Sequence, residues 1–388
     1  METAIRKHRV AVVGLGFIGP VHIENLRRLP NVEVTGVLHS SPEASEAKAK
    51  LLGVPKFYRS YDELVKDPEI DCIHICTPNH LHYEMVKKGL EADKHIICDK
   101  PLAVTAKEGA ELVELGKTKS KLVKAITFNQ RYYPVLRHLK VMREKGELGE
   151  VYSIIGSYIQ DWLFLNTDYN WRLETEKSGD TKAVADIGSH LLDLLEYISG
   201  LRIVEVLADF HTVHKTRRKP KGPITTFSTK EQSGPVEYEE VEIKTEDFAT
   251  ILLRFDNGAK GSATLSQIGA GTRNRLSFEI SGSNGTISWS NENSDQFMIG
   301  KRGEWNKVGY RDPALVYPEA RSLMSYPGGH NEGYGDTFKA IFTEIYKSIG
   351  TEIQPDEVPY PTFEDGLRQL ILCEKIAESN SKQCWVKV

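Results

Sequence analysis

Short apolar runs alternate with longer amphipathic segments between residues 8 and 127, and no other feature constrains the fold as much. The apolar runs have the length of strands, and the segments between them have helical periodicity. In chain order the runs are RVAVV, VEVTGVL, DCIHIC, KHIIC and KLVKAITF. Strands that alternate with helices build a parallel sheet with helices on both faces. Residues 1–127 are therefore expected to form a doubly wound α/β domain.

The pattern changes after about residue 145. Period-two alternation takes over, and the sequences FDNGA and GSNGT interrupt it. Asn or Asp followed by Gly supplies the positive φ angles of tight turns, so these are hairpin signals. The basic run at 214–221 is interpreted as a solvated loop. Residues 128–388 are expected to form an α+β domain with a large, mostly antiparallel open sheet and helices near residues 187–199, 332–349 and 363–379.

Three glycines directly follow the first strand. Gly14, Gly16 and Gly19 have the spacing G-x-G-x-x-G and open the first helix. In a Rossmann domain the first glycine allows the tight turn, the second lets the backbone approach a pyrophosphate, and the third permits close packing. The helix N-terminus faces the negative charge. These glycines, with Phe17 and Ile18 between them, are the predicted dinucleotide site.

The second strand ends without the acidic residue that usually binds the adenosine ribose of NAD. His39 stands there, followed by Ser40 and Ser41. Ser41 before Pro42 is a good N-cap for the next helix, and Ser40 or Ser41 could also bind the ribose or its phosphate. No arginine follows in this turn to pair with a 2′-phosphate. The cofactor is expected to be NAD or NADP, with a preference for NAD.

Two polar segments follow the next strands, at the edge where doubly wound sheets bind ligands. They contribute the predicted cofactor-binding residues Thr77, Pro78, Asn79, His82, Asp99 and Lys100. Pro101 disfavours helical geometry at Lys100. A lysine in this place can stabilise an oxygen that gains negative charge during hydride transfer. The alternative is a surface lysine in a loop.

Asp186 and His190 are four residues apart at the start of an amphipathic helix, so they share one face. Histidine can accept a hydroxyl proton near neutral pH, and a carboxylate beside it can orient the ring. The alternative is that Asp186 only caps the helix and that His190 belongs to the core. Asp193 extends the same face and is interpreted as a solvated residue.

Charge and cysteine content exclude other classes of protein. The net charge of −4 gives no basic field that would attract nucleic acid. The five cysteines are expected to be reduced thiols. Cys72 and Cys76 could form half of a zinc site, but no second cysteine pair completes it, so no metal is expected. Without a signal peptide or a membrane-spanning run, the protein is expected to be cytoplasmic, with no membrane partner.

Four segments together resemble the glucose-fructose oxidoreductase / inositol dehydrogenase / rhizopine-catabolism (GFO/IDH/MocA) family. In chain order they are VGLGFIG, TPNHLH, DKPLAVT and WRLETEKSGDTKAVADIGSHLLDLLEYISG. In that family the lysine of an E-K-P motif and a D-x-x-x-H pair form the catalytic group. The resemblance implies that Lys100 binds and polarises the reacting hydroxyl and that His190 accepts and donates the proton. It also implies that Asp186 orients His190 or shares a relay with it.

The sequence departs from the family pattern in two places. Asp99 replaces the usual Glu before the lysine, which shortens by one methylene a side chain expected near the nicotinamide. The glycine-rich run that usually precedes D-x-x-x-H reads KSGDTKAV, so the loop over the substrate is expected to differ.

Two further segments, SYIQDWLFLNTDYNWR and YPGGHNEGYGDTF, resemble a branch of the family that includes levoglucosan dehydrogenase and other pyranose oxidoreductases. Sugars offer hydroxyls to hydrogen-bonding groups and C–H faces to aromatic rings. The predicted substrate-binding residues, several of which have a structural role as their alternative, are Lys100, Asp161, Trp162, Trp171, Arg172, Asp186, His190 and His330.

The predicted activity is NAD(P)-dependent hydride transfer between nicotinamide and a secondary hydroxyl of a pyranose sugar, an anhydrosugar or a cyclitol. Two alternatives stay open: a dinucleotide-sensing regulator on the same fold, and a reductase of the dihydrodiol or biliverdin type. The joint presence of Lys100, Asp186 and His190 favours the enzyme. An open sheet with one uncovered face is expected to bind a second copy, which gives a homodimer or a homotetramer.

Overall fold

The chain forms two compact units in the computed structural model, which describes residues 7–222, 237–351 and 358–388. Unit 1 comprises residues 1–129 and 334–370, and unit 2 comprises residues 130–333 and 371–388. Residues 1–6, and residue 236 at the start of one run of period-two alternation, lie outside the described residues. No helix in the described ranges is both long and apolar enough to cross a membrane.

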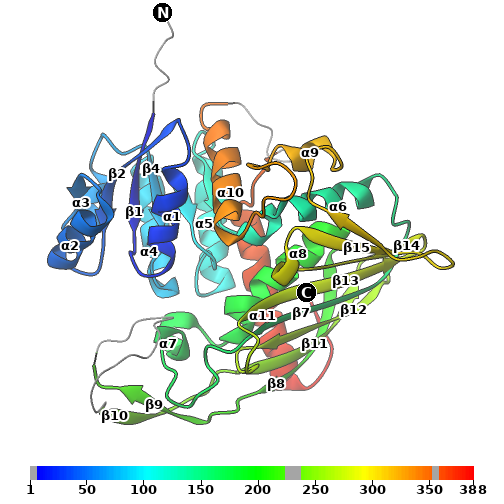
Figure 1. Ribbon diagram of the computed structural model, residues 1–388. Helices are drawn as coiled ribbons and strands as arrows, with labels where there is room; N and C mark the ends of the chain where they lie inside the picture. The colour runs from blue at the N-terminus through cyan, green and yellow to red at the C-terminus, as the bar shows by residue number, and fades with distance from the viewer. Residues whose placement is uncertain (1–6, 223–236, 352–357) are drawn as a thin grey trace, which may run out of the picture. The chain divides into compact units, whose positions relative to one another are not determined.

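Residues 334–370 belong to unit 1, whereas the sequence pattern places them in the second domain. Helix α10 (Tyr334–Ser348) packs against α1 (Ile18–Leu26), and Figure 1 shows the two helices side by side. Farther along, the backbone N–H of Ile126 donates to the carbonyl of Pro361 at 2.9 Å. Packing and backbone pairing with the parallel sheet therefore bring this late segment into the first unit.

Unit 1 is built on a six-stranded parallel sheet in the order β3-β2-β1-β4-β5-β6. The strands are β1 (His8–Val13), β2 (Val32–Leu38), β3 (Lys56–Phe57), β4 (Cys72–Ile75), β5 (His95–Cys98) and β6 (Lys124–Ile126). The five runs found in the sequence form five of these strands, and the short edge strand β3 is the one they did not predict. The strand order is that of a doubly wound dinucleotide-binding sheet, so this part of the predicted fold is confirmed.

Local signals set where the helices of unit 1 begin and end. Its other helices are α2 (Pro42–Leu52), α3 (Tyr61–Val65), η1 (Asn79–Leu81), α4 (His82–Glu91) and α5 (Ala106–Thr118), together with the first part of α11 (Phe363–Lys382). Ser41 caps α2, because its side chain accepts the N–H of Ala44, and Gly53 ends that helix in a left-handed conformation with φ of 61°. The predicted N-cap at Ser41 is thereby confirmed.

Unit 2 is built on a nine-stranded sheet in the order β16-β15-β14-β13-β7-β12-β11-β8-β17. Its strands are β7 (Val151–Gln160), β8 (Ile203–His211), β11 (Phe248–Phe255), β12 (Lys260–Ser266), β13 (Asn274–Gly282), β14 (Gly285–Ser290), β15 (Gln296–Gly300), β16 (Lys307–Tyr310) and β17 (Val386–Lys387). The turn sequences FDNGA and GSNGT join antiparallel hairpins, as predicted. The β7–β12 pair is parallel and the other pairs are antiparallel, so the predicted mostly antiparallel sheet is confirmed.

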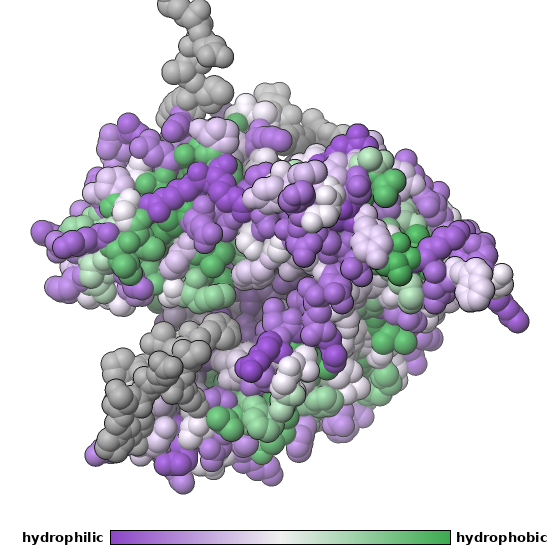
Figure 2. Space-filling model, in the orientation of Figure 1, coloured by the Kyte–Doolittle hydropathy of each residue, from purple (hydrophilic) through white to green (hydrophobic). Residues whose placement is uncertain are grey.

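One face of this sheet packs against helices, and the other is more exposed. The helical segments of unit 2 are η2 (Asn129–Tyr132), α6 (Pro134–Glu144), η3 (Trp171–Leu173), α7 (Thr175–Ser178), η4 (Val184–Gly188), α8 (Ser189–Ser199), η5 (Asn291–Asn293), α9 (Pro318–Arg321) and most of α11. Helix α8 packs on β7 and β13. On the other face Ile155 and Leu252 keep 54% and 43% of their surface exposed. In Figure 2 hydrophobic residues interrupt the polar surface where Figure 1 places the strands of this sheet.

The basic run at 214–221 is not a solvated loop. Residues Thr216–Pro220 form strand β9, which pairs with β10 (Tyr238–Glu242) in a separate two-stranded sheet. Arg217 points inward and is fully buried. The interpretation was wrong because strand alternation turns one basic residue of the run toward the interior, where an acidic partner neutralises it.

A chain of buried polar side chains crosses unit 1. His22 on α1 and His74 on β4 are both fully buried, and their Nδ1 atoms lie 2.9 Å apart. His74 Nε2 lies 2.8 Å from the hydroxyl of Tyr346 on α10, and Cys76 Sγ lies 3.3 Å from His22 Nδ1. Burial lowers the pKa of His22 to about 4, partly opposed by Asp99. Burial lowers the pKa of His74 as well.

The buried side chains of His22 and His74 predict that the protein loses stability on acidification. In the unfolded protein these histidines have the ordinary pKa of about 6.5 and bind protons below that pH, whereas the buried rings of the folded protein stay neutral. The free energy of unfolding therefore falls as the pH drops from about 7 toward 4. His22 alone should lower the free energy of unfolding by roughly 2 kcal/mol between pH 7 and pH 5. Urea denaturation at several pH values measures this loss. The variant His22→Gln should flatten the dependence, and exposed His211→Gln should not; equal pH slopes for wild type and His22→Gln would contradict the account.

Candidate cofactor and catalytic site

The glycine-rich loop lies between β1 and α1, and a side chain would clash with the protein backbone at two of its three glycines. Gly14 has φ of 87°, and a Cβ there would lie 2.5 Å from the carbonyl oxygen of Cys76. A Cβ on Gly19 would lie 2.2 Å from the carbonyl oxygen of Gly14. A Cβ on Gly16 would meet no atom within 4 Å. Gly14 and Gly19 are thus required for packing, whereas Gly16 leaves open space in front of the loop.

The first turn of α1 fits a phosphate group. Phe17 precedes the helix and has no oxygen with which to cap it, and the first turn, beginning at Ile18, contains no acidic residue. The backbone N–H groups of a first turn need acceptors and attract negative charge. Together with the space at Gly16, this turn fits the pyrophosphate of a dinucleotide.

The segment after β2 supports the same loop. His39 Nδ1 accepts the backbone N–H of Leu15 at 3.4 Å, so the imidazole contacts the loop from the place where an acid was expected. Burial lowers the pKa of His39, and Lys48 lowers it further. Ser41 is engaged in capping α2, and Ser40 is exposed beside it.

The loops after β4 and β5 are tied together by His82. Its ring is fully buried, with Nδ1 2.6 Å from the carbonyl oxygen of Pro101 and Nε2 2.8 Å from that of Thr77. Burial lowers the pKa of His82, although the two carbonyl groups and the charge of Asp99 act to raise it. The ring therefore fixes the loop that contains Pro78 and Asn79 to the loop that follows Lys100.

Asp99 and Lys100 lie at the carboxyl end of β5. The backbone N–H of Asp99 continues the sheet by donating to Ile75 at 2.8 Å. The carboxylate of Asp99 accepts the hydroxyl of Thr127 at 2.6 Å. The side chain of Asp99 is thus fixed toward β6, and Lys100 is partly exposed at the same edge as the glycine loop.

In unit 2 the carboxylate of Asp186 is held by two donors. Arg172 Nε lies 3.1 Å from Asp186 Oδ1, and Gln267 Nε2 lies 2.9 Å from Asp186 Oδ2. Arg172 follows Trp171 on η3, and its guanidinium stacks 4.5 Å from the Trp171 ring centre. Two of the predicted substrate residues, Arg172 and Asp186, are thereby brought together. Gln267 was not predicted, because a single polar residue after β12 gives no spacing signal.

His190 lies one turn beyond Asp186, on the first turn of α8. The turn from Val184 to Gly188 is a π-helix, so the start of this helix is wider than an ordinary α-helix. The His190 side chain is largely buried.

Tyr158 on β7 is buried too. Burial and the nearby Asp186 carboxylate together raise the pKa of Tyr158, which keeps the phenol neutral.

Asp193 is not the solvated residue that the sequence suggested. It is 2% exposed, and both carboxylate oxygens pair with Arg131, at 2.8 Å from Nε and 2.5 Å from Nη2. A bidentate pair of this kind fixes orientation as well as distance. The interaction fastens the helix that carries His190 to η2, and the sequence held no sign of it because the partners lie 62 residues apart.

The remaining predicted substrate residues occupy separate places in unit 2. Asp161 accepts the N–H of Gly271 at 3.2 Å, and Trp162 Nε1 donates to Gln160 at 2.7 Å. His330 is exposed in a loop that Arg311 holds by donating to its carbonyl oxygen.

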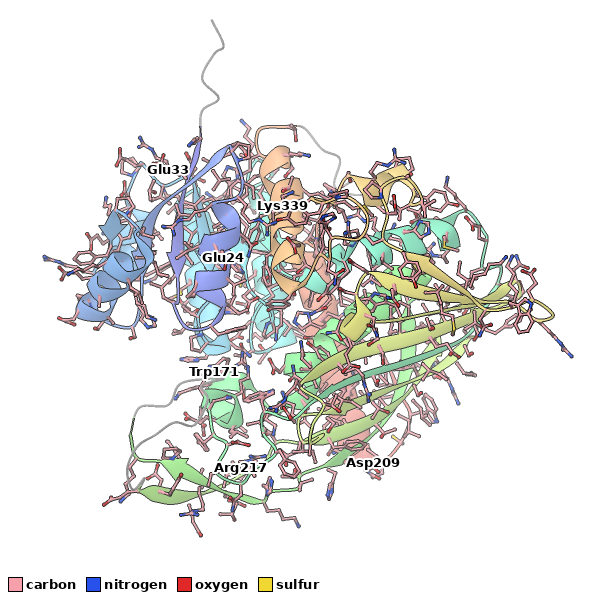
Figure 3. The ribbon with its side chains drawn as sticks, in the orientation of Figure 1. Glu24, Glu33, Trp171, Asp209, Arg217 and Lys339 are labelled. Atoms are coloured by element: carbon pink, nitrogen blue, oxygen red, sulfur yellow. The ribbon has the colours of Figure 1, made fainter. Side chains whose placement is uncertain are left out.

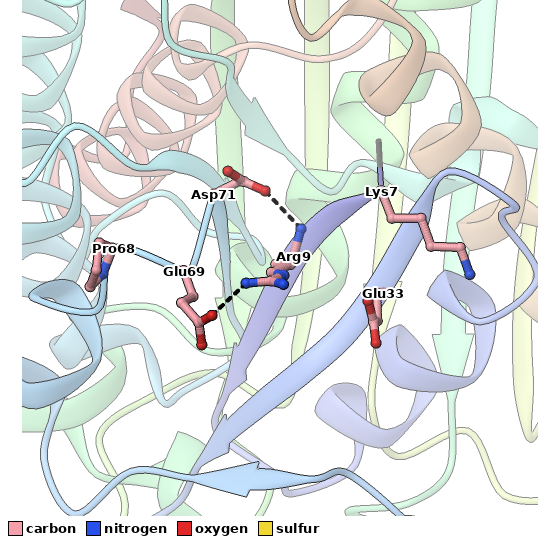
Figure 4. A pocket seen from close by; sticks show the side chains of 6 residues that line it. All are labelled: Lys7, Arg9, Glu33, Pro68, Glu69 and Asp71. Atoms are coloured by element: carbon pink, nitrogen blue, oxygen red, sulfur yellow. Dashed lines mark hydrogen bonds and ion pairs between the residues drawn. The ribbon is translucent and has the colours of Figure 1, made fainter. Parts of the chain in front are cut away.

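A cavity of about 510 Å³ opens in unit 1 away from the glycine loop. It is lined by Lys7, Arg9, Glu33, Pro68, Glu69 and Asp71, and Figure 4 shows the ion pair of Arg9 with Glu69. These residues surround the amino ends of β1 and β2, opposite the carboxyl ends that ligands favour. Among the described residues no three His, Cys, Asp or Glu side chains are placed to share a metal ion.

Comparisons with known proteins cover almost the whole chain. Residues 8–127 match the description "Oxidoreductase family, NAD-binding Rossmann fold", and residues 136–288 match "GFO/IDH/MocA C-terminal domain". The chain is 30% identical to levoglucosan dehydrogenase of Pseudarthrobacter phenanthrenivorans, with 98% of this chain and 97% of that protein aligned. It is 28% identical to myo-inositol 2-dehydrogenase of Thermotoga maritima, over 94% and 93% of the two chains.

A solved structure of levoglucosan dehydrogenase in complex with NADH and levoglucosan has a TM-score of 0.86 and 27% identity, and it covers 99% of this chain and 100% of that one. Fold, glycine loop and matched domains together define an NAD-binding oxidoreductase. Within that class the chain belongs to the GFO/IDH/MocA family, which confirms the resemblance seen in its sequence motifs.

The glycine loop yields a prediction that separates cofactor binding from folding. Gly16→Ala should keep the melting temperature of wild type, because its methyl group meets no protein atom, yet weaken NADH binding by roughly tenfold or more, because it fills the space before the pyrophosphate. Gly19→Ala should instead lower the melting temperature. NADH fluorescence titration and thermal unfolding measure both. Wild-type NADH affinity in Gly16→Ala would refute this assignment.

Proposed function

We propose that this protein catalyses the reversible NAD(P)-dependent oxidation of a secondary hydroxyl group on a pyranose sugar, an anhydrosugar or a cyclitol. Its similarity to a levoglucosan dehydrogenase and to a myo-inositol dehydrogenase, each over nearly the full chain, supports this substrate class. The observation that carries the proposal is the Asp186 carboxylate, which Arg172 and Gln267 fix one helical turn before His190. A fixed carboxylate beside an imidazole suits removal of a hydroxyl proton.

The cofactor site would consist of the glycine loop, the first turn of α1 and the loops after β2, β4 and β5. NAD is the preferred cofactor, because no arginine follows β2 and His39 contacts the loop there. When bound, the nicotinamide accepts a hydride from the carbinol carbon. Thr77, Pro78, Asn79 and Asp99 would border the nicotinamide, and His82 would hold their loops in place.

Three side chains would carry the chemistry. Lys100 would donate a hydrogen bond to the reacting oxygen and stabilise the alkoxide character that develops there. His190 would accept the hydroxyl proton in oxidation and return it in reduction, and Asp186 would orient the ring or share the proton relay. Arg172, Asp161, Trp162, Trp171 and His330 would bind the other hydroxyls and C–H faces of the substrate.

The surroundings of the protein follow from the same proposal. We infer a cytoplasmic enzyme without metal, nucleic-acid or membrane partners, whose only ligands are the cofactor and a small carbohydrate. The exposed face of the nine-stranded sheet, with Ile155 and Leu252, would form the contact of a homodimer or a homotetramer. Stable oligomers bury exposed apolar surface of this kind between their subunits.

A spectrophotometric screen at 340 nm tests the proposal, with NAD and NADP each offered pyranoses, anhydrosugars and inositols. We expect turnover with at least one member of the panel and a higher kcat/KM with NAD. Lys100→Ala should then lower kcat by roughly 100- to 1,000-fold, because the developing oxyanion loses its cation. Exposed Lys107→Ala is the matched control and should behave as wild type.

The screen also separates the alternatives. NADH binding without turnover on any sugar or cyclitol would contradict the enzyme and favour a dinucleotide-sensing regulator. Turnover of folded Lys100→Ala within a few-fold of wild type would contradict the role of that lysine.

A further inference from the structure

A buried ion cluster lies in unit 2 just before the helix that carries His190. Lys182 Nζ lies 2.5 Å from Asp247 Oδ1, and Arg217 Nη2 lies 2.9 Å from the same oxygen. All three side chains are fully buried. Lys182 falls in KSGDTKAV, the stretch that departs from the usual glycine-rich run, so a glycine-rich loop is replaced here by an anchored one.

Arg217 ties this cluster to the loop that leads to Trp171 and Arg172. Its guanidinium donates to the carbonyl oxygens of Leu163 at 2.9 Å, Leu165 at 2.8 Å and Asp168 at 3.1 Å. Figure 3 labels both Arg217 and Trp171, which come from different elements of the same unit. One side chain therefore holds the whole turn on the N-terminal side of Arg172.

Asp247 connects the cluster to Gln267, the second of the two donors to the Asp186 carboxylate. Its second oxygen accepts the backbone N–H of Val213 at 2.9 Å and of His214 at 3.2 Å. Its own carbonyl oxygen accepts the backbone N–H of Gln267 at 3.0 Å. Gln267 is the residue whose side chain donates to Asp186, so displacing Asp247 would move that donor.

Glu246 fastens the other end of the same segment. Its carboxylate accepts the backbone N–H of Lys182 at 2.9 Å and of Val184 at 2.8 Å, which caps the π-helix that contains Asp186. The backbone N–H of Asp186 in turn donates to the carbonyl of Lys182 at 2.8 Å. The backbone of Lys182 thus donates to Glu246 and accepts from Asp186, so the position of the Asp186 backbone depends on that of Lys182.

The charges of the cluster are matched rather than isolated. Burial lowers the pKa of Lys182, against the attraction of Asp247. Burial alone would raise the pKa of Asp247, but Lys182 and Arg217 outweigh it and leave that pKa below its ordinary value. Burial raises the pKa of Glu246, although hydrogen bonds from the backbone act to lower it. Buried ion pairs stabilise a fold poorly, because desolvation offsets their attraction, so stability alone does not account for this cluster.

We propose that Lys182, Arg217, Asp247 and Glu246 are positioning residues that hold Asp186, Arg172 and Gln267 in the geometry that binds the sugar or cyclitol. The inference rests on the proposed function for its substrate. The four residues contact the three segments that meet at the Asp186 carboxylate, and they act on the substrate through those segments. The cluster thus sets the affinity and orientation of the substrate and leaves cofactor binding to unit 1 unaffected.

The variant Lys182→Met tests this proposal with the least disturbance. It keeps the length of the side chain, and Asp247 keeps Arg217 and two backbone N–H groups, so the protein should fold. We expect a higher KM for the sugar and a kcat/KM that is lower by roughly 10- to 100-fold, with the Kd for NADH within twofold of wild type. A partial loss of folded protein would lower kcat and leave KM unchanged. Exposed Lys307→Met, which also breaks an ion pair, is the control and should match wild type.

Hydrogen exchange provides a readout that does not depend on turnover. Backbone amides of residues 182–190 should exchange faster in Lys182→Met than in wild type, and the glycine loop of unit 1 should not change. Unchanged exchange together with a sugar KM within twofold of wild type would overturn the proposal. If wild type is inert on every sugar and cyclitol, the proposed function fails, and faster exchange at 182–190 in Lys182→Met would still support the anchoring of Asp186.

Discussion

The parallel sheet of unit 1 has central strands that are buried on both faces. Val10, Val12, Ile73 and Ile96 are fully buried, and a strand in that situation can present polar groups only where it ends. The glycine loop, the TPNH loop and the Asp99–Lys100 pair all follow carboxyl ends of adjacent strands, which places them at one edge of the sheet. The burial of the core therefore determines where this unit can hold a dinucleotide.

Unit 2 depends on charged side chains that are held away from water in defined positions. The Asp186 carboxylate has two donors, Asp193 has a bidentate arginine, and Asp247 lies between two cations. Each charge is costly to bury alone and acceptable only when its partner is in place. The result is a set of paired polar groups along the helical segment that carries His190, which suits recognition of a polyhydroxylated substrate by fixed donors and acceptors.

The sequence predicted the features that have a period or a short spacing. Alternation of strands and helices gave the sheet of unit 1, Asn-Gly turns gave the hairpins of unit 2, and Ser41 before Pro42 marked the start of α2. It did not predict Gln267 as a partner of Asp186, the Arg131–Asp193 pair or the inward side chain of Arg217. These depend on contacts between residues far apart in the chain, which leave no local pattern. The solvated interpretations of Asp193 and of the run at 214–221 failed for the same reason, because a charged residue is buried wherever a distant partner neutralises it.

The central claim is that a hydride passes between a carbinol carbon of a sugar or cyclitol and the nicotinamide. The most direct test is to incubate the protein with NAD and perdeuterated levoglucosan, glucose or myo-inositol, and to examine the recovered cofactor by mass spectrometry and NMR. The account predicts reduced cofactor with one deuterium at C4 of the nicotinamide for at least one of these substrates. Reduced cofactor without deuterium, or no reduction with any of them while NADH binds, would contradict it.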